Sequence, residues 1–573
     1  MTAERVTSAT APSRRWWGDG RTHTRLGTAV YVVAVLNIST GLLHTWRVRL
    51  GQLTDLLPGA LSSAAAAATV VAGVYLFALG HALKRRKRRA LRAASALLVL
   101  SVGLNIVKEA PVSALVSATV LLLLVLARGE FFAVGDQSTR WRAVWSFFAL
   151  LTFSILVGTG VYWANDDAIS GGWPGLTQVV VAVLAGMVGV TSSVQLGETR
   201  AEDVIGALLL GLGLMTSLTT IYLVLRSPEP RPRLTTDDES RVRELLDKYP
   251  DSLGYFALRD DKAVVWSPTG KSAIGYRVIS GVMLAAGDPI GDPEAWPGAI
   301  REFCAQAELH AWTPAVLGCS EQGGRVWTRE TGFDALELGD EAIIDTATFS
   351  LEGRAMRNVR QMVNRVRRAG YECEVMRVRD MLPERRREII RDADAWRGTA
   401  TERGFSMALG RVADARDPNS VVATASKDGV VRGVLQFAPW GREGMSLDLM
   451  RRDRAADAGL SDLLIVDAIA ASAALGMRQV SLNFAVFRSA LEGGERLGAG
   501  PVLRMWCRLL VFVSRWFQIE SLYRFNAKFQ PAWNPRFIVY PSASTLPRIA
   551  LAALEAEAFL VWPRLPALLG GKS

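Results

Sequence analysis

Histidine and cysteine are scarce in this chain of 573 residues, and their scarcity argues against several kinds of site. There are four histidines, and only His310 lies after the apolar first part of the chain. A histidine-based triad or a histidine-rich zinc site is therefore not expected in the second part. The four cysteines show neither metal-ligand spacing nor a disulfide framework, which fits a reducing compartment. They are Cys304, Cys319, Cys373 and Cys507.

Charged residues are also scarce within the apolar runs that precede residue 227. Runs long enough, or nearly long enough, to span a bilayer lie at about 27–46, 62–83, 93–109, 112–127, 143–164, 176–196 and 204–226. They predict a transmembrane domain of six or seven helices over 27–226, after a cytoplasmic tail at 1–26. Because few charges lie inside the runs, an ion pathway is only weakly supported. No short apolar core with a cleavage site follows Arg14 and Arg15, so we expect no removable signal peptide.

Loop charges predict which side of the membrane each loop occupies. Two basic loops predict the cytoplasmic side and one acidic loop predicts the outer side; these loops lie at 84–89, 128–142 and 166–167. If every later run crosses the membrane, the second part of the chain lies outside, away from nucleic acid and nucleotide cofactors. We therefore expect one run to be re-entrant or interfacial, and the candidates are the short pair at 93–127 and the run at 176–196. The alternative is an external second part.

The second part of the chain alternates strand-like and helical patterns after a proline-containing linker at 227–237. The first unit, 238–353, contains expected helices at 238–248, 294–309 and 322–331, with strands within 253–286 and at 312–318 and 334–338. The second unit, 354–548, contains a basic helix, a hairpin at 420–426 and 430–438, strands at 444–450 and 478–485, and a helix at 459–475. A tail helix is expected at 549–573. Two mixed α/β units in tandem fit a doubled acyltransferase-like fold, although pattern alone leaves another single α/β fold open.

The segment 354–368 separates arginines from apolar residues at helical spacing. One arc holds Arg354, Arg357, Arg360, Arg365, Arg367 and Arg368, and the other holds Met356, Val359, Met362, Val363 and Val366. A helix packed by its apolar side would present the guanidinium groups to a polyanion such as nucleic acid. An ordinary solvated helix face would give the same pattern.

Asp448 is the strongest candidate for chemistry, because it interrupts an apolar strand pattern at 444–450. An isolated buried carboxylate is costly and needs a partner or a ligand. Arg451 is the expected partner. The alternatives are a plain buried ion pair and a site for the cationic amino group of a substrate.

Three further segments carry weaker signals. Residues 519–536 interleave aromatic side chains with basic ones, which suits phosphate binding and stacking, although an amphipathic helix running into a proline-rich loop would look similar. The glycine-rich stretch 496–500 is a weak match to a pyrophosphate loop for acetyl-coenzyme A, because it does not clearly follow a strand and open a helix. Asp340 and Glu341 precede a strand-like run and could equally form a turn.

Several short motifs stand in a common order over roughly 240–545. They are Gly287-Asp288-Pro289-Ile290-Gly291, Gly332-Phe333 with Gly339-Asp340-Glu341-Ala342, Phe349-Ser350-Leu351-Glu352-Gly353, Asp448-Leu449-Met450-Arg451-Arg452, and Asn526-Ala527-Lys528-Phe529 with Pro531 and Trp533. Together they resemble the catalytic domain of phosphatidylglycerol lysyltransferases, the multiple peptide resistance factor family. The stretches 481–488 and 518–524 look most like its actinobacterial branch, in which some members are fused to a lysyl-tRNA synthetase. This chain stops at Ser573, so we expect a separate synthetase.

The resemblance implies a multi-pass α-helical membrane domain followed by tandem acetyltransferase-like (GNAT) folds with a tunnel between them. It implies transfer of an aminoacyl group, lysyl above all, from aminoacyl-tRNA to a glycerol hydroxyl of phosphatidylglycerol at the cell membrane. The cationic lipid product would lower the negative surface charge and favour resistance to cationic antimicrobial peptides. Ester-to-ester exchange needs no ATP and no cofactor, so catalysis would be mainly positioning and charge stabilisation. The membrane part departs from the long flippase portion of larger members, which argues against lipid flipping.

The resemblance also suggests roles for residues, with the catalytic domain in the cytoplasm. Asp448 would hold the substrate ammonium, Arg451 would fix Asp448 or a phosphate, and Lys528 would stabilise the oxyanion or bind lipid phosphate. Further substrate-binding candidates are Asp340, Glu341, Arg452, Asn483, Tyr523, Arg524 and Arg536. The expected tRNA-binding residues are Arg354, Arg357, Arg360, Arg365 and Arg368. No metal ligands are expected, and a homo-oligomer is left open.

Two other classes of function remain open from sequence. A coenzyme-A-dependent acyltransferase of the same fold would need a working pyrophosphate loop, for which only 496–500 is available. A transporter or sensor with a regulatory α/β domain would need charged residues facing a pore, and few are present. Within the transferase hypothesis, alanine or ornithine could replace lysine, so alanyl-phosphatidylglycerol synthesis is also open.

Overall fold

The computed structural model describes residues 22–50, 59–107, 110–131, 133, 139–165, 169, 173–189, 194, 199–225, 230, 234–398, 404–486 and 519–560. The chain divides into two compact units. The first is Met1–Pro228 with Glu308–Ala311, and the second is Glu229–Ala307 with Trp312–Ser573. The division therefore falls inside the stretch that the sequence analysis assigned to a linker.

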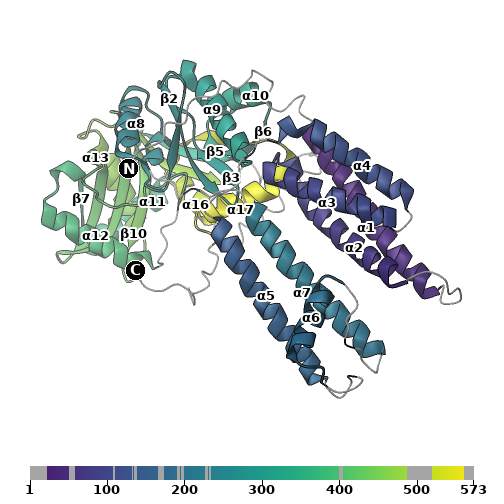
Figure 1. The fold of residues 1–573 in the computed structure, drawn as a ribbon. Coiled ribbons are helices and arrows are strands. Elements are labelled where there is room, and N and C mark those ends of the chain that lie inside the picture. The colour runs from purple at the N-terminus through teal and green to yellow at the C-terminus, as the bar shows by residue number, and fades with distance from the viewer. Residues whose placement is uncertain are drawn as a thin grey trace. The chain divides into compact units, whose positions relative to one another are not determined.

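The first unit has a helix in each of the predicted apolar runs. These helices are α1 (Thr22–Leu50), α2 (Gly59–Lys84), α3 (Arg88–Val107), α4 (Pro111–Leu126), α5 (Thr139–Ala164), α6 (Leu176–Met187) and α7 (Thr199–Leu225), with the short η1 (Arg128–Glu130) after α4. Helix α1 packs against α2 and α4, whereas α5, α6 and α7 pack against one another (Figure 1). Three described stretches are long and apolar enough to cross a membrane, namely Arg88–Ile106, Val144–Ala164 and Val204–Leu223.

Helix α6 is too short to cross a bilayer as a straight helix. It has 12 residues, which span about 18 Å, whereas the hydrocarbon core is roughly 30 Å thick. Helix α4, with 16 residues, spans about 24 Å. Both short helices lie in the runs that the sequence analysis singled out as candidates for incomplete crossing.

Buried polar side chains join α1, α3 and α4. Asn37 Nδ2 donates to Ser101 Oγ at 2.7 Å, and Asn105 Nδ2 donates to Asn37 Oδ1 at 3.2 Å. Ser101 Oγ lies 3.4 Å from Ser117 Oγ, and all four residues are almost completely buried. Because lipid tails offer no hydrogen bonds, such contacts help membrane helices to associate. The network therefore has a structural explanation in the packing of these helices.

The second unit is a mixed α/β domain. Its helices are α8 (Thr236–Lys248), α9 (Trp296–Leu309), α10 (Glu321–Thr331), α11 (Arg357–Arg368), α12 (Pro383–Arg397), α13 (Leu460–Ser472), α16 (Ile519–Ala527) and α17 (Leu546–Ala556), with short helices η3 (Gly254–Leu258), η4 (Pro293–Ala295), η5 (Val378–Asp380) and η6 (Ala543–Thr545). Its strands are β1 (Ala263–Trp266), β2 (Ser272–Ile279), β3 (Val282–Ala286), β4 (Ile290–Gly291), β5 (Thr313–Cys319), β6 (Asp334–Asp345), β7 (Tyr371–Arg377), β8 (Val421–Lys427), β9 (Val430–Trp440), β10 (Gly444–Arg452), β11 (Gln479–Val486) and β12 (Ala532–Tyr540).

One sheet of 12 strands runs through both predicted α/β units, in the order β1-β2-β3-β5-β12-β6-β11-β10-β9-β8-β7, with β4 paired to β2. The last strands of the two halves are exchanged, because β12 pairs with β5 of the first half and β6 pairs with β11 of the second. The expected strand at 334–338 extends to residue 345, so Asp340 and Glu341 lie in a strand and not in a turn. The segment 519–536 forms a helix followed by a strand, which corrects the alternative of a proline-rich loop.

Helix α11 forms where the arginine pattern predicts it and buries the predicted apolar side. Val359, Val363 and Val366 are buried in the same apolar cluster as Leu460 and Leu463 of α13. Fully burying a valine or leucine contributes roughly 1.5–3 kcal/mol. This packing turns the opposite side of α11 to solvent.

A buried ion pair joins the two exchanged strands at the centre of the sheet. Glu341 of β6 accepts hydrogen bonds from Arg536 Nε at 3.0 Å, from Arg536 Nη2, and from Ser252 Oγ at 3.1 Å. Its second oxygen accepts from Ser481 Oγ at 2.5 Å. Glu341 is 0% exposed and Arg536 is 4% exposed. The two side chains therefore pair with each other inside the sheet, and Arg536 Nη1 is buried without a hydrogen-bond partner among the described residues. Their role in substrate binding stays a prediction.

Candidate functional site

The neighbouring strands β10 and β11 separate within the sheet. The point where they separate, which we call the opening, defines the candidate site. Their parallel pairing ends at Ser446 and Ser481. Beyond that point, β10 has a bulge that leaves Asp448 without an opposite residue on β9. Strand β11 has an irregularity before Phe484, where Asn483 adopts a left-handed backbone with φ 66°. Bulges of this kind re-aim side chains and occur next to active sites.

A segment that we call the strap, residues 404–417, is hydrogen-bonded to both strands where they part. Asn483 Nδ2 donates to Met407 O at 3.4 Å and to Leu447 O. The Leu409 amide donates to Asp448 Oδ1 at 2.8 Å. The strap therefore lies directly at the opening between β10 and β11.

Two regions outside the second half hold the strap in place. Glu557, just after α17, accepts from the Phe405 and Ser406 amides at 2.7 and 3.0 Å. Arg259, which follows η3 in the first half, donates to Ala408 O at 3.2 Å. The position of the strap thus depends on both halves of the sheet domain.

Asp448 is the carboxylate at the centre of this arrangement. Its second oxygen accepts from Gln436 Nε2 at 2.5 Å. Burial raises the pKa of Asp448 to about 6, although the hydrogen bonds from Leu409 and Gln436 act to lower it. At neutral pH the group is therefore ionised but costly to keep in place, which is the condition of a carboxylate that binds a cation.

The predicted pairing of Asp448 with Arg451 is wrong. Arg451 Nη1 donates to Ala393 O at 3.0 Å and lies 3.5 Å from Asp394 Oδ1, both on α12. Arg451 follows the bulge and is opposite Val434 of β9, so it is carried beyond the opening toward α12. Arg451 consequently braces α12 against the sheet.

Lys528 lies on the other side of the sheet from Asp448. Its Nζ is 3.3 Å from Asp462 Oδ1 of α13 and 4.8 Å from the centre of the Phe525 ring. Phe525 packs against the apolar cluster of α11 and α13, whereas Leu409 of the strap belongs to a different cluster. The structure therefore does not gather Asp448 and Lys528 around one point on one face.

The remaining predicted substrate-binding residues are dispersed. Asn483 lies at the opening, and its Oδ1 is buried without a hydrogen-bond partner among the described residues. Tyr523 packs against Trp533, with ring centres 5.1 Å apart. Arg452 is exposed and donates to Ala456 O at 3.3 Å, Arg524 is exposed, and Asp340 is buried in β6.

The predicted tRNA-binding residues form one exposed face on and just before α11. Arg354, Arg357, Arg365 and Arg368 are exposed, and none of them forms an ion pair with another described residue. Arg360 is half-buried and donates to Leu351 O and Gly353 O, so it holds the turn that precedes the helix. Arg367 pairs with Asp467 of α13 at 2.5 Å. The free positive charge is therefore carried by four of the five predicted residues.

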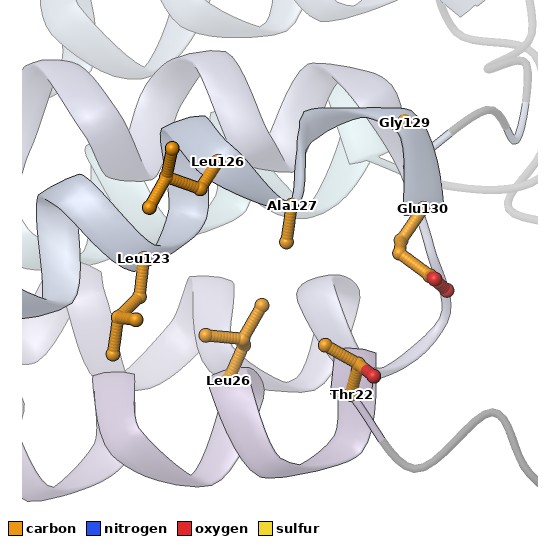
Figure 2. Close-up of a pocket in the computed structure, with 7 residues that line it drawn as sticks. All are labelled: Thr22, Leu26, Leu123, Leu126, Ala127, Gly129 and Glu130. Atoms are coloured by element: carbon orange, nitrogen blue, oxygen red, sulfur yellow. The ribbon is translucent and has the colours of Figure 1, made fainter.

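A pocket of about 450 Å³ occurs in the first unit, between the start of α1 and the end of α4. Figure 2 shows Leu26 and Leu123 on its apolar side and Thr22 and Glu130 at its polar end. It contains none of the residues predicted to bind substrate. Its mainly apolar lining offers no group for acyl transfer, so the strand opening remains the candidate site.

The comparison with protein families identifies the second unit. A family described as "Phosphatidylglycerol lysyltransferase, C-terminal" matches residues 243–540, which is just over half of the chain. The chain belongs to this family. A second family, described as "Transmembrane region of lysyl-tRNA synthetase", matches residues 21–226, so the first unit is a membrane region.

Curated relatives and solved structures agree with this lysyltransferase family. The chain is 42% identical over 496 residues to the "Lysylphosphatidylglycerol biosynthesis bifunctional protein LysX" of Rhodococcus opacus (strain B4), covering 85% of this chain and 44% of that protein. It is 43% identical over 446 residues to the protein of the same name from Mycobacterium avium (strain 104), covering 77% and 38%. The chain thus spans less than half the length of these relatives. The structure of L-PGS from Bacillus licheniformis, 21% identical, shares the fold with a TM-score of 0.50 over 58% of this chain and 99% of that one.

Two features of this candidate site were missed from sequence. The strap lies in an irregular stretch with no periodic pattern, so nothing marked it. Gln436 did carry a signal, because it is a lone polar residue within the apolar run of β9. A polar residue inside an otherwise apolar strand needs a hydrogen-bond partner, and that partner proved to be Asp448.

The electrostatics of Asp448 predict an unusual effect on stability. A pH of 7 lies above both the folded pKa of Asp448, about 6, and its unfolded pKa, about 3.9. The raised pKa therefore lowers the free energy of unfolding at pH 7 by roughly 3 kcal/mol. This cost appears as pH rises from about 4 to about 6 and is absent below pH 4. Asp448→Asn removes it and loses a hydrogen bond worth about 1 kcal/mol. We expect the full-length variant in detergent to unfold at a higher temperature at pH 7.

Asp417 supplies a control of opposite sign. Burial alone would raise its pKa, but hydrogen bonds from Arg411 and Arg243 outweigh that effect and lower it. Asp417→Asn should therefore lose stability at pH 7, and the loss should shrink as the pH falls and the wild-type carboxylate becomes protonated. A lower unfolding temperature for Asp448→Asn than for wild type at pH 7 would contradict the account of Asp448.

Proposed function

We propose that this protein transfers an aminoacyl group, lysyl in the first place, from aminoacyl-tRNA to a glycerol hydroxyl of phosphatidylglycerol. The observation that carries the proposal is the ionised, costly carboxylate of Asp448 at the opening between β10 and β11, in a chain of the lysyltransferase family. A buried carboxylate with unused lone pairs suits an ammonium group. Both the α-amino group and the side chain of a lysyl residue provide one.

The reaction exchanges one ester for another. The glycerol oxygen bonds to the aminoacyl carbonyl carbon, the bond from that carbon to the tRNA 3′ oxygen breaks, and the glycerol proton passes to the leaving oxygen. In this proposal Asp448 holds the ammonium and so places the carbonyl beside the hydroxyl, which is catalysis by positioning. Lys528 lies on the α13 side of the sheet and not on the face of Asp448, so of its two predicted roles this proposal keeps only binding of the lipid phosphate. A lysyl-tRNA synthetase acting as a separate partner charges the donor.

Transfer in vitro tests the function. Purified protein is mixed with phosphatidylglycerol vesicles and with separately charged lysyl- or alanyl-tRNA, and the lipid product is measured. We expect lysyl-phosphatidylglycerol from lysyl-tRNA. Asp448→Asn should reduce the rate roughly 100-fold, because losing one partner of a buried charge pair costs about 2–5 kcal/mol. Asp247→Asn, a change at an exposed position on α8, is the matched control.

The other outcomes of this assay are distinct. Lipid product from alanyl-tRNA alone would support the transferase activity but show that alanine, and not lysine, is transferred. No lipid product from either tRNA, together with turnover of an acyl-coenzyme A, would establish the second candidate, an acyltransferase of the same fold. That candidate is disfavoured because the strap hydrogen-bonds to a side chain of each strand at the opening, Asp448 of β10 and Asn483 of β11. The weak glycine-rich stretch 496–500 lies outside the described residues.

The basic face of α11 is proposed to bind tRNA phosphates. Replacing Arg354, Arg357, Arg365 and Arg368 by Gln should weaken use of charged tRNA. It should also lower the slope of log affinity against log salt by about 3, since each lost phosphate contact contributes roughly 0.7–0.9. The affinity is measured from the tRNA dependence of transfer at several salt concentrations.

The control for α11 removes the same amount of charge elsewhere. Arg325, Arg329, Arg387 and Arg391 are exposed arginines that each pair with a neighbouring carboxylate. Their replacement by Gln should leave the salt slope almost unchanged. Equal slopes for the two quadruple variants would make the α11 face an ordinary solvated surface.

The donor requires the second unit to lie in the cytoplasm, and the length of α6 supports that placement. If α6 does not cross and the other six helices, α4 included, do, the chain returns to the side of the basic loop 84–89. An impermeant thiol label on intact cells should therefore miss Ser350→Cys, an exposed position in the second unit, and react after lysis. Asn165→Cys, at the exposed end of α5, should be labelled in intact cells. Labelling of Ser350→Cys in intact cells would place the second unit outside the cell and exclude aminoacyl-tRNA as the donor.

A further inference from the structure

We infer that Gln436 is the positioning residue of the site, which fixes the carboxylate of Asp448 and the strap in one arrangement. The inference rests on the proposed role of Asp448 in holding a substrate ammonium. Gln436 is 1% exposed and lies on β9 between two apolar core residues, Leu435 and Phe437. Its amide is the polar group that β9 sends to the opening.

Both N–H groups and the carbonyl oxygen of the Gln436 amide form hydrogen bonds. Nε2 donates to Asp448 Oδ2 at 2.5 Å and to Arg411 O at 2.9 Å. Oε1 accepts from the Ala413 amide at 2.6 Å. Because a backbone amide can only donate here, Oε1 must face Ala413, and the amino group must face Asp448. The strap thus fixes which end of Gln436 meets the carboxylate.

The bulge explains why Asp448 needs such a residue. Asp448 is the extra residue of the bulge, and Leu449 takes the place opposite Gln436 in the strand pairing. A residue without an opposite neighbour is not held in register by the ladder. Leu409 holds one oxygen of Asp448 and Gln436 holds the other, so together they set the plane of the carboxylate. Each oxygen keeps a lone pair for a cation.

Gln436 also connects the carboxylate to the rest of the strap. Its two strap partners, Arg411 and Ala413, follow Leu409, which contacts Asp448, in the chain. Arg411 also forms an ion pair with Asp417 at the end of the strap. Ala413 has a left-handed backbone, with φ 45°, which a non-glycine residue adopts only when its surroundings hold it. Loss of the Gln436 amide therefore disturbs both the carboxylate and the turn above it.

Two substitutions separate positioning from a merely structural role. Gln436→Met keeps an unbranched side chain of similar size but cannot donate to Asp448. Gln436→Glu keeps the shape, and its protonated form can still donate. Two charged groups act on Asp448: Asp417 raises its pKa and Arg411 lowers it. Neither residue is changed in the two variants.

The readout is the pH profile of kcat/KM for lysyl transfer by the full-length protein. Gln436→Met should move the acid limb to higher pH by about one unit and lower kcat/KM about tenfold at pH 7, because Asp448 loses a hydrogen bond that stabilises its charged form. Gln436→Glu should retain activity near pH 6 and lose it as the pH rises, because two adjacent carboxylates resist full ionisation. Gln322→Met, exposed on α10, should match wild type.

A stability cycle keeps this inference separate from the proposed function. Unfolding temperatures at pH 7 are compared for wild type, Gln436→Met, Asp448→Asn and the double variant. A positioning contact predicts that the two changes are non-additive. Non-additive shifts in a protein that makes no aminoacyl lipid would overturn the proposed function and leave the Gln436–Asp448 contact standing. Additive shifts, or a pH profile that drops equally at every pH in Gln436→Met, would overturn the positioning role.

Discussion

The second unit depends on the buried pair of Glu341 and Arg536, because this pair lies where the two halves exchange strands. A buried ion pair of this kind is weak evidence for stability, since removing two charges from water costs about as much as their attraction returns. In the observed register Glu341 is opposite Asn534 and Arg536 is opposite Gly339, so the two charges meet diagonally across β6 and β12. Ser252 and Ser481, from opposite halves, add hydrogen bonds to Glu341, whereas Arg536 Nη1 is buried without a partner among the described residues. Because an unpaired buried charge is strongly destabilising, we infer that the pair favours the arrangement in which β6 and β12 lie side by side in one sheet.

The continuous sheet explains how the candidate site can draw on both halves. Asp448, Gln436 and Asn483 come from the second half, whereas Arg259, which holds the strap, comes from the first. Glu557, near the end of the described chain, holds the start of the strap. If the halves packed as independent domains, these contacts would vary with every domain motion. A shared sheet removes that freedom and lets a carboxylate on a bulge keep a defined position.

Much of this was predictable from sequence where the signal is local. The helix α11 and the alternation of helices and strands follow from periodic apolar residues, and Asp448 was visible as a charge in an apolar strand. The features that were predicted wrongly or missed depend on contacts between residues far apart in the sequence. Strand exchange leaves no trace in local pattern, and the bulge at Asp448 shifts Arg451 onto α12, so spacing along the chain gave the wrong partner. Gln436 needed only the rule that buried polar groups have partners.

The two halves use the same architecture differently, and the difference favours the second half as the place of the proposed site. Each half has one parallel strand pair, β3–β5 and β10–β11. At the end of the first pair, the Asp288 carboxylate accepts from the Ser320 amide and hydroxyl at the start of α10. A carboxylate there satisfies the helix N-terminus, which would otherwise attract a ligand anion. At the end of the second pair, the carboxylate of Asp448 meets the strap, and Asn483 Oδ1 is unpaired among the described residues. In the first half a side chain of the protein itself meets the helix N-terminus, whereas in the second half Asn483 Oδ1 is left without a partner among the described residues. This contrast is the reason for placing the proposed substrate site in the second half.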